Sequence, residues 1–265
     1  MGEFSADEAW AVADALADAA RVATLRYFRQ PDLMVANKDG AGFDPVTAAD
    51  KAAERAMREV LAQERPQDGI LGEEENDVAS RSGWTWVLDP IDGTRGFMSG
   101  TPTWGVLIAL SNAQGPKLGI IDQPYIGERF SGGFGRASVI GPTGLAKLGV
   151  RTTTRLSDAI IFTTFPEINT PPERRAFEAV AGLCNLTRYG MDCYAYALLA
   201  AGQIDLVIEA GLHAYDICAP IAVIEAAGGI VTDWTGAPAH SGGRALAAAT
   251  PELHAAAMEA LAKAL

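Results

Sequence analysis

The sequence predicts an α/β protein in which sheets lie between layers of helices. Two helical segments open the chain, short apolar segments separated by Gly and Pro follow, and helices then alternate with strands up to residue 265. Short apolar segments bounded by Gly and Pro are typical of strands, and their alternation with helices is typical of a layered arrangement. We expect a mostly antiparallel sheet in the first half of the chain and a mixed sheet in the second half.

The first half is predicted to begin with two helices. Ser5 and Glu8 have the spacing of a capping box before a helix that ends near Phe28. Thr47 is the expected N-cap of a second, amphipathic helix, which ends near Leu61. The Gly- and Asp-rich segment at residues 37–45, between the two helices, is expected to be a flap. Five strands should follow, at residues 70–71, 84–88, 106–110, 118–121 and 129–132.

The second half is predicted to alternate between strands and helices. The strands are expected at residues 160–164, 206–209, 230–232 and 246–249, and the helices at residues 172–183, 193–201, 216–227 and 251–265. Asp192 precedes the second of these helices and Gly202 follows it, which predicts a cap at one end and a stop at the other. A weakly marked boundary near residues 141–149 is expected to divide the chain into two halves, residues 1–143 and residues 144–265.

Charge and composition exclude several function classes. The 265 residues include 33 acidic and 21 basic ones, which gives a formal net charge of −12. Nucleic acids and anionic membrane surfaces are bound through a surplus of Lys and Arg, so neither partner is expected. The sequence has no secretory signal, no apolar run of about 18 residues and three widely spaced cysteines, which predicts a cytoplasmic protein with reduced thiols. A phosphorylated substrate stays open, because bound cations can reverse the local field.

Four acidic residues lie where a predicted element begins or ends. They are Glu73, Asp89, Asp92 and Asp216. An apolar strand leads into Asp89, and the Pro and Gly that follow turn the chain so that Asp92 comes to lie beside it. Two neighbouring carboxylates repel each other unless a cation neutralises them, and such hard oxygen ligands favour Mg²⁺ or Mn²⁺ over Zn²⁺. The alternative for each residue is an ordinary turn or N-cap role, which Asp often has.

Three segments of the chain resemble the signature regions of the inositol monophosphatase family, whose members are Mg²⁺-dependent phosphomonoesterases. The segments are residues 72–74 (Gly-Glu-Glu), 89–94 (Asp-Pro-Ile-Asp-Gly-Thr), and 215–216 (Tyr-Asp) followed by 225–229 (Glu-Ala-Ala-Gly-Gly). The resemblance extends from Lys38 to Gly229 and implies the αβαβα sandwich of this family. Residues 1–143 would then form a metal-binding half and residues 144–265 a substrate-binding half of one catalytic unit. A homodimer is also implied.

The resemblance assigns roles to individual residues. Two or three Mg²⁺ ions, with Mn²⁺ as a substitute, would be held by Glu73, Asp89, the Ile91 carbonyl, Asp92 and Asp216. Glu73 and Thr94 would position and deprotonate a metal-activated water for in-line attack, with Asp92 also in the catalytic set. Gly93 and Thr94 would bind the phosphate. Lys38 matches a lysine in the family's flap, and its alternative is a solvated loop residue.

The substrate is predicted from segments that differ from those of inositol phosphatases. Residues 95–97 (Arg-Gly-Phe), residues 119–124 with Glu128 and Arg129, and residues 189–196 resemble the histidinol-phosphate phosphatases of this family. Histidinol carries an ammonium group and an imidazole, whereas inositol is a neutral polyol, so carboxylates away from the metal ions should favour histidinol. Asp192 and Glu209 are the candidates, although Asp192 also fits a helix cap and inositol phosphatases use a Glu at the position of Glu209. Arg95 would contact either the phosphate or a neighbouring subunit.

The expected activity is therefore hydrolysis of L-histidinol phosphate, a step of histidine biosynthesis. The alternative within the family is an inositol-1-phosphate or broad sugar-phosphate phosphatase. A nucleotide 3′-phosphatase and a non-catalytic metal-binding homologue are more remote. The complete set of predicted metal ligands argues against the non-catalytic homologue, because a protein without catalysis has no need of every ligand.

Overall fold

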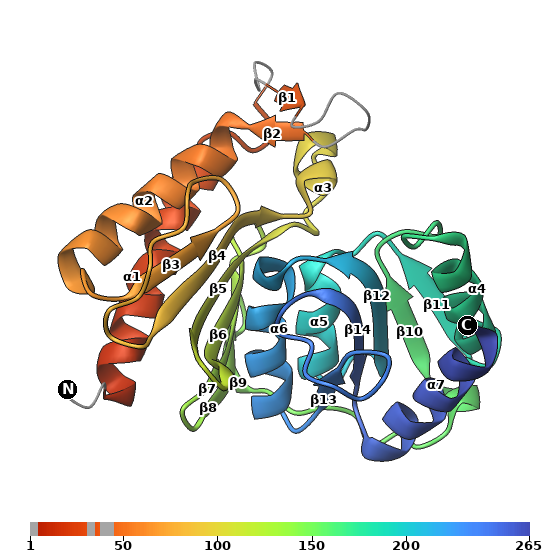
Figure 1. Cartoon of the computed structure of the whole chain (residues 1–265). Helices are drawn as coiled ribbons and strands as arrows, with labels where there is room; N and C mark the ends of the chain where they lie inside the picture. Colours follow the sequence, from red (N-terminus) through yellow and green to blue (C-terminus); the bar gives the residue numbers. More distant parts are fainter. Residues whose placement is uncertain (1–4, 31–34, 38–44) are drawn as a thin grey trace.

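The computed structural model describes residues 5–30, 35–37 and 45–265, and its elements form the five layers predicted from the sequence. The first layer holds α1 (Ala6–Leu25) and α2 (Ala48–Glu64), and a seven-stranded sheet follows. Next come α5 (Cys193–Ala200) and α6 (Ala214–Ala226), then a five-stranded sheet, and finally α4 (Pro171–Ala181) and α7 (Pro251–Ala264). Figure 1 shows α5 and α6 between the two sheets. The αβαβα prediction is confirmed.

The seven-stranded sheet has its strands in chain order, from β3 to β9. These strands are β3 (Gly69–Gly72), β4 (Thr85–Asp92), β5 (Gly105–Asn112), β6 (Gly115–Gln123), β7 (Glu128–Gly133), β8 (Arg136–Gly141) and β9 (Gly144–Lys147). Only β3 and β4 are parallel among these neighbours, which confirms the mostly antiparallel prediction. β8 and β9 were not predicted, and the sheet extends to Lys147.

The five-stranded sheet is mixed, as predicted. Its order is β11-β10-β12-β14-β13, with bounds Leu186–Tyr189 for β11, Ile160–Thr163 for β10, Leu206–Leu212 for β12, Gly243–Ala248 for β14 and Ile230–Thr232 for β13. β10 is parallel to both β11 and β12, whereas β14 is antiparallel to β12 and β13. A short 3-10 helix, η1 (Leu156–Asp158), precedes β10, and a separate pair is formed by β1 (Val35–Asn37) and β2 (Pro45–Thr47).

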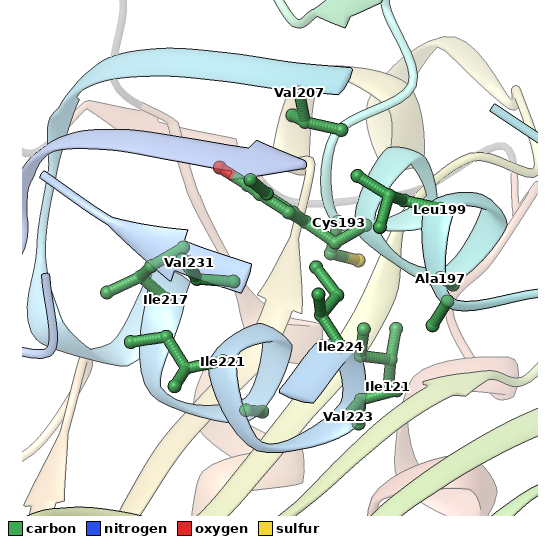
Figure 2. Packing of buried hydrophobic residues seen from close by; sticks show 14 of the residues in the cluster. Ile121, Cys193, Ala197, Leu199, Val207, Ile217, Ile221, Val223, Ile224 and Val231 are labelled. Carbon is green, nitrogen blue, oxygen red and sulfur yellow. The ribbon is translucent and has the colours of Figure 1, made fainter. Parts of the chain in front are cut away.

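The core between the two sheets explains the composition of α5 and α6. Each helix is apolar around most of its circumference because it is covered by a sheet on both sides. Figure 2 shows Ile217, Ile221 and Ile224 of α6 packed with side chains of α5 and of both sheets. Gly119 and Gly132 on the seven-stranded sheet are also needed here, because a Cβ at either position would collide with the α6 backbone. The close approach fixes where the N-terminus of α6 lies.

Two helix ends differ from the predictions, and one confirms them. Ser5 and Glu8 form the predicted capping box of α1. α6 begins two residues earlier than predicted, with His213 as N-cap and Asp216 within the first turn. Asp192 precedes α5, but its side chain makes no capping hydrogen bond. The side chain of Thr47 and the predicted flap around Lys38 lie outside the described residues. Within the part of the chain that the structure describes, no helix is long and apolar enough to cross a membrane.

Candidate active site

Asp89 and Asp92 of β4 converge with Asp216 of α6. One carboxylate oxygen from each of the three residues lies within 4.8 Å of the other two. Regular alternation along a strand would send residues 89 and 92 to opposite faces. The pairing of β4 with β5 is irregular between these two residues: Asp89 lies opposite Leu107, and Asp92 lies opposite Gly105. This bulge inserts one extra residue and brings both carboxylates to the same side.

The three converging carboxyl groups have raised pKa values. Burial raises the pKa of Asp89 well above its usual range, and the charges of Glu73, Asp92 and Asp216 add to this effect. Burial and the charge of Asp216 raise the pKa of Asp92 to about 7, although the Cys193 N–H donates to its Oδ2 at 2.5 Å. Burial likewise raises the pKa of Asp216 to about 7. Ionised carboxylates at this distance require a cation to neutralise them.

The donor set fits a hard divalent cation. Three convergent carboxylates provide oxygen ligands only, which suits Mg²⁺ or Mn²⁺. Glu73 directly follows β3, at the strand end next to the carboxyl end of β4. Glu73 lies outside the compact set of three, but its charge raises the pKa values of both Asp89 and Asp216. A cation in this region would therefore be attracted by four acidic groups.

The turn after β4 presents the residues predicted to bind phosphate. The Ile91 N–H donates to Asp89 Oδ1 at 3.1 Å, and the Thr94 hydroxyl donates to the Ile91 carbonyl at 3.2 Å. The Ile91 side chain is buried in an apolar cluster with Phe97 and Trp104, which anchors the turn. Gly93 has φ +86° and leads into the short helix α3 (Thr94–Ser99). Its left-handed conformation is one that glycine adopts without strain.

A cavity of about 380 Å³ opens beside the acidic cluster. Its lining comes from the β4–α3 turn, the residues after β10, the start of α5, the end of β12 and the start of α6. These residues are Asp92, Gly93, Thr94, Arg95, Thr164, Phe165, Asp192, Glu209, Ala210, Gly211, Leu212 and Asp216. The cavity thus joins the predicted phosphate-binding turn to both predicted substrate-binding carboxylates.

Asp192 faces this cavity instead of capping α5. Its backbone has φ +48° and ψ −142°, which is a strained conformation for a residue with a side chain. A Cβ at Gly93 would lie 2.8 Å from the Asp192 Cγ, so the carboxyl group occupies the space that the glycine leaves open. Burial, followed by the charge of Asp92, raises the pKa of Asp192 to about 7, while Thr103 and Arg95 lower it.

Glu209 lies near the end of β12 and is only 6% exposed. Its Oε1 accepts a hydrogen bond from the Thr164 N–H at 2.6 Å. Burial raises the pKa of Glu209 to about 7, and the charge of Asp192 contributes to this increase. Two carboxyl groups outside the compact acidic cluster therefore face one cavity.

Phe165 was missed at the level of sequence. It follows β10, and the guanidinium of Arg95 lies over its ring at 4.5 Å. Because β10 and β12 are parallel, their carboxyl ends meet at one edge of the sheet, where ligands commonly bind. This rule, applied to the predicted strands, would have placed Thr164 and Phe165 next to Glu209. The aromatic ring and the guanidinium together form one wall of the cavity.

One of the distinctive segments, residues 119–124 with Glu128 and Arg129, contributes to the structure away from the cavity. Asp122 is fully buried, and its carboxylate binds Arg21 at 2.6 Å and Arg129 at 2.8 Å. Glu128 accepts a hydrogen bond from the Tyr194 hydroxyl at 2.6 Å. No residue of this segment lines the cavity. The segment joins α1 and α5 to the seven-stranded sheet.

Comparisons with known proteins agree on one family. The inositol monophosphatase family model matches residues 6–265. The chloroplastic bifunctional phosphatase IMPL2 of Arabidopsis thaliana is 42% identical over 238 residues, which cover 89% of this chain and 67% of that protein. A histidinol-phosphatase of Chlorobaculum parvum is 34% identical over 226 residues, covering 83% of this chain and 84% of that protein. The solved structure of an inositol monophosphatase from Zymomonas mobilis matches with a TM-score of 0.85 at 38% identity, covering 98% of this chain and 100% of that one.

Proposed function

The chain belongs to the inositol monophosphatase family, and we propose that it hydrolyses L-histidinol phosphate to L-histidinol and phosphate in this cavity. Membership makes the protein a phosphatase that acts on phosphoric monoesters. The choice of substrate depends on one observation, the carboxyl group of Asp192 in the cavity. It makes no capping hydrogen bond to the helix that follows, and beside its hydrogen bond with Thr103 it faces the cavity, where it would bind an ammonium group.

The proposed metal ligands are Glu73, Asp89, the Ile91 carbonyl, Asp92 and Asp216, which would hold two or three Mg²⁺ ions, or Mn²⁺ in their place. When bound, the cations supply positive charge for the phosphate and for the attacking and leaving oxygens. The side chains of Glu73 and Thr94 orient the attacking water, and the Glu73 carboxylate accepts its proton. The N–H groups of Gly93 and Thr94 hold the phosphate oxygens. Attack occurs in line with the P–O bond to the alcohol; this bond breaks, and the leaving oxygen takes up a proton from solvent to give the free alcohol.

Asp192 and Glu209 bind the alcohol part of the substrate in this proposal. Histidinol phosphate brings a cationic ammonium group, whose binding offsets the mutual repulsion of the two carboxylates. Arg95 and Phe165 form a wall with a flat face, which suits the imidazole ring. The family relatives that are histidinol-phosphatases support this choice.

Inositol 1-phosphate is the second candidate substrate. It is favoured by the position of Glu209, which can also accept hydrogen bonds from hydroxyl groups, and by the Zymomonas mobilis structure, which is that of an inositol monophosphatase. The two candidates are separated by measuring kcat/KM for both esters under the same Mg²⁺ concentration. A higher kcat/KM for L-histidinol phosphate is expected, and a higher value for inositol 1-phosphate would reverse the order of the proposals.

The catalytic role of the acidic cluster has its own test. Asp92→Asn removes one proposed ligand charge with little change in shape. We expect phosphatase activity to be lost and divalent-cation binding to weaken. Unchanged activity in this variant would refute the proposed site, whereas a wild-type chain that hydrolyses neither ester would favour the non-catalytic homologue.

The remaining features of the proposal concern the assembly. A homodimer and the roles of a metal-binding and a substrate-binding half are proposed from the family resemblance, a cytoplasmic location from the three widely spaced cysteines, and the division at residue 143 from the predicted boundary near residues 141–149. Light scattering coupled to size-exclusion chromatography tests the first of these, since a dimer doubles the measured mass.

A further inference from the structure

Glu54 lies on the face of α2 that points into the protein, and its carboxylate is fully buried. Burying a charged group is costly unless hydrogen bonds and an opposite charge compensate for it. The side chain of Arg58 and the loop after β3 provide this compensation. Arg58, one turn further along α2, contacts Glu54 Oε1 through both Nε and Nη2 at 2.8 Å.

The loop bound by Glu54 is the segment after β3. Glu54 Oε2 accepts a hydrogen bond from the Glu74 N–H at 2.8 Å, and Oε1 accepts one from the Glu75 N–H at 3.1 Å. Arg58 adds a third contact, because its Nη2 donates to the Glu75 carbonyl at 3.1 Å. The helix thus binds the main chain of the loop directly on the C-terminal side of Glu73.

The N-terminal side of Glu73 is equally constrained. A Cβ at Gly72 would collide with the Glu54 carboxylate and lie 2.8 Å from Arg58 Nη2. Glycine at this position therefore permits the contact between α2 and the loop. Glu73 lies between two residues that are both packed against the Glu54–Arg58 pair, while its own charge acts on Asp89 and Asp216.

We propose that Glu54 and Arg58 are positioning residues that hold Glu73 at the divalent-cation site. The inference rests on the proposed function, in which Glu73 is a metal ligand and orients water. Neither Glu54 nor Arg58 touches the substrate cavity. They fix the backbone conformation on either side of Glu73. Residues that contact a metal ligand commonly set its orientation in this way.

The test compares Glu54→Gln with Glu59→Gln, which removes the same charge from an exposed position of the same helix. A glutamine amide at position 54 would place a donor against donors, because the hydrogen bonds that Glu54 accepts from Arg58, Glu74 and Glu75 all come from N–H groups. Mn²⁺ binding is measured without substrate, by electron paramagnetic resonance of the free ion. We expect binding to weaken about 10- to 100-fold in Glu54→Gln and to stay at the wild-type value in Glu59→Gln.

Kinetics and a second variant separate positioning from folding. At saturating Mg²⁺, Glu54→Gln should lower kcat and change KM by less than about threefold, because Asp192 and Glu209 are untouched. Gly72→Ala disturbs the same contact from the other side, so it should weaken Mn²⁺ binding as well. Glu54→Asp keeps the charge but is shorter, and it should fall between wild type and Glu54→Gln.

Several results would overturn the inference. Wild-type Mn²⁺ affinity in folded Glu54→Gln and Gly72→Ala would show that Glu73 does not depend on the pair. Loss of the cooperative thermal transition in Glu54→Gln, Glu54→Asp and Gly72→Ala would show that Glu54 and Arg58 serve the fold alone. Because Mn²⁺ binding is read without substrate, these outcomes differ from failure of the proposed function, which would appear as a wild-type chain that binds no Mn²⁺ or hydrolyses neither ester.

Discussion

Replacing Asp192 with Asn removes one negative charge from the cavity while the shape of the side chain stays almost the same. The amide group would occupy the same space next to Gly93 as the carboxyl group and can still accept a hydrogen bond from Thr103. The charge of Asp92 contributes to the raised pKa of Asp192, so the two groups repel each other when both are ionised. Because the charge at position 192 also acts on the cation site, the assay uses saturating Mg²⁺, so that it reports substrate recognition alone.

The magnitude follows from the kind of hydrogen bond that is lost. A charge-assisted hydrogen bond between a carboxylate and an ammonium group contributes about 1.5–3 kcal/mol. Each 1.4 kcal/mol corresponds to about a tenfold change in an equilibrium constant. Asp192→Asn is therefore expected to lower kcat/KM for L-histidinol phosphate about 10- to 100-fold. A neutral polyol has no ammonium group, so kcat/KM for inositol 1-phosphate should change by less than about threefold.

The assay measures phosphate release from both esters at saturating Mg²⁺, for the wild type, Asp192→Asn and Asp7→Asn. Asp7 is an exposed residue in the first turn of α1, and its substitution controls for a general effect of net charge. An equal loss on both esters would mean that Asp192 supports the site instead of recognising the ammonium group. No loss on L-histidinol phosphate would refute the assignment of Asp192 altogether.

Three further predictions concern stability and geometry. Gly93→Ala should abolish most activity and destabilise the fold by about 1–3 kcal/mol, because the new Cβ meets Asp192 and φ is +86°; activity and thermal melts check this. Arg129→Ala should cost about 3 kcal/mol by removing one of the two cations at buried Asp122, with unchanged Mn²⁺ affinity; denaturant unfolding and Mn²⁺ titration check both parts. Four cavity carboxyl groups have pKa values raised to about 7, so the folded metal-free protein binds extra protons between about pH 4 and pH 7. Its melting temperature should therefore fall as pH rises from about 5 to about 8, and Mg²⁺ should raise it most at the higher pH; a flat profile would contradict this.

The elements that sequence predicted well are those whose signals are local. The first helix has a complete capping box at Ser5, and β5 is an almost continuous buried apolar strand. β9 and β11 were missed because they lie at sheet edges and most of their residues are exposed. An edge strand pairs with one neighbour and needs no apolar pattern. Its conformation depends on a partner strand that the residues of the segment itself do not identify.

The acidic cluster was predicted from the positions of its residues at element ends, and then from the family resemblance, and not from strand periodicity. Periodicity alone places residues 89 and 92 on opposite faces of β4, and only the bulge opposite β5 brings them together. Pro90 between them gives a partial signal, because proline in a strand interior usually marks an edge or a bulge. The third carboxylate comes from α6, whose close packing requires glycine at positions 119 and 132, more than eighty residues earlier in the chain.

Asp192 shows most clearly why a prediction made from neighbouring residues alone fails at the candidate site. An Asp before a helix normally caps it, and that preference reflects only the few residues around it. Here the Cys193 N–H at the start of α5 is taken by Asp92, which lies about one hundred residues earlier in the chain. The first turn of the helix is thus satisfied by a group of the acidic cluster, and the Asp192 side chain is free to turn towards Gly93 with a left-handed backbone. Such strain persists only where surrounding contacts impose it, and the contacts that do so here are the ones that connect the proposed metal site to the proposed substrate site.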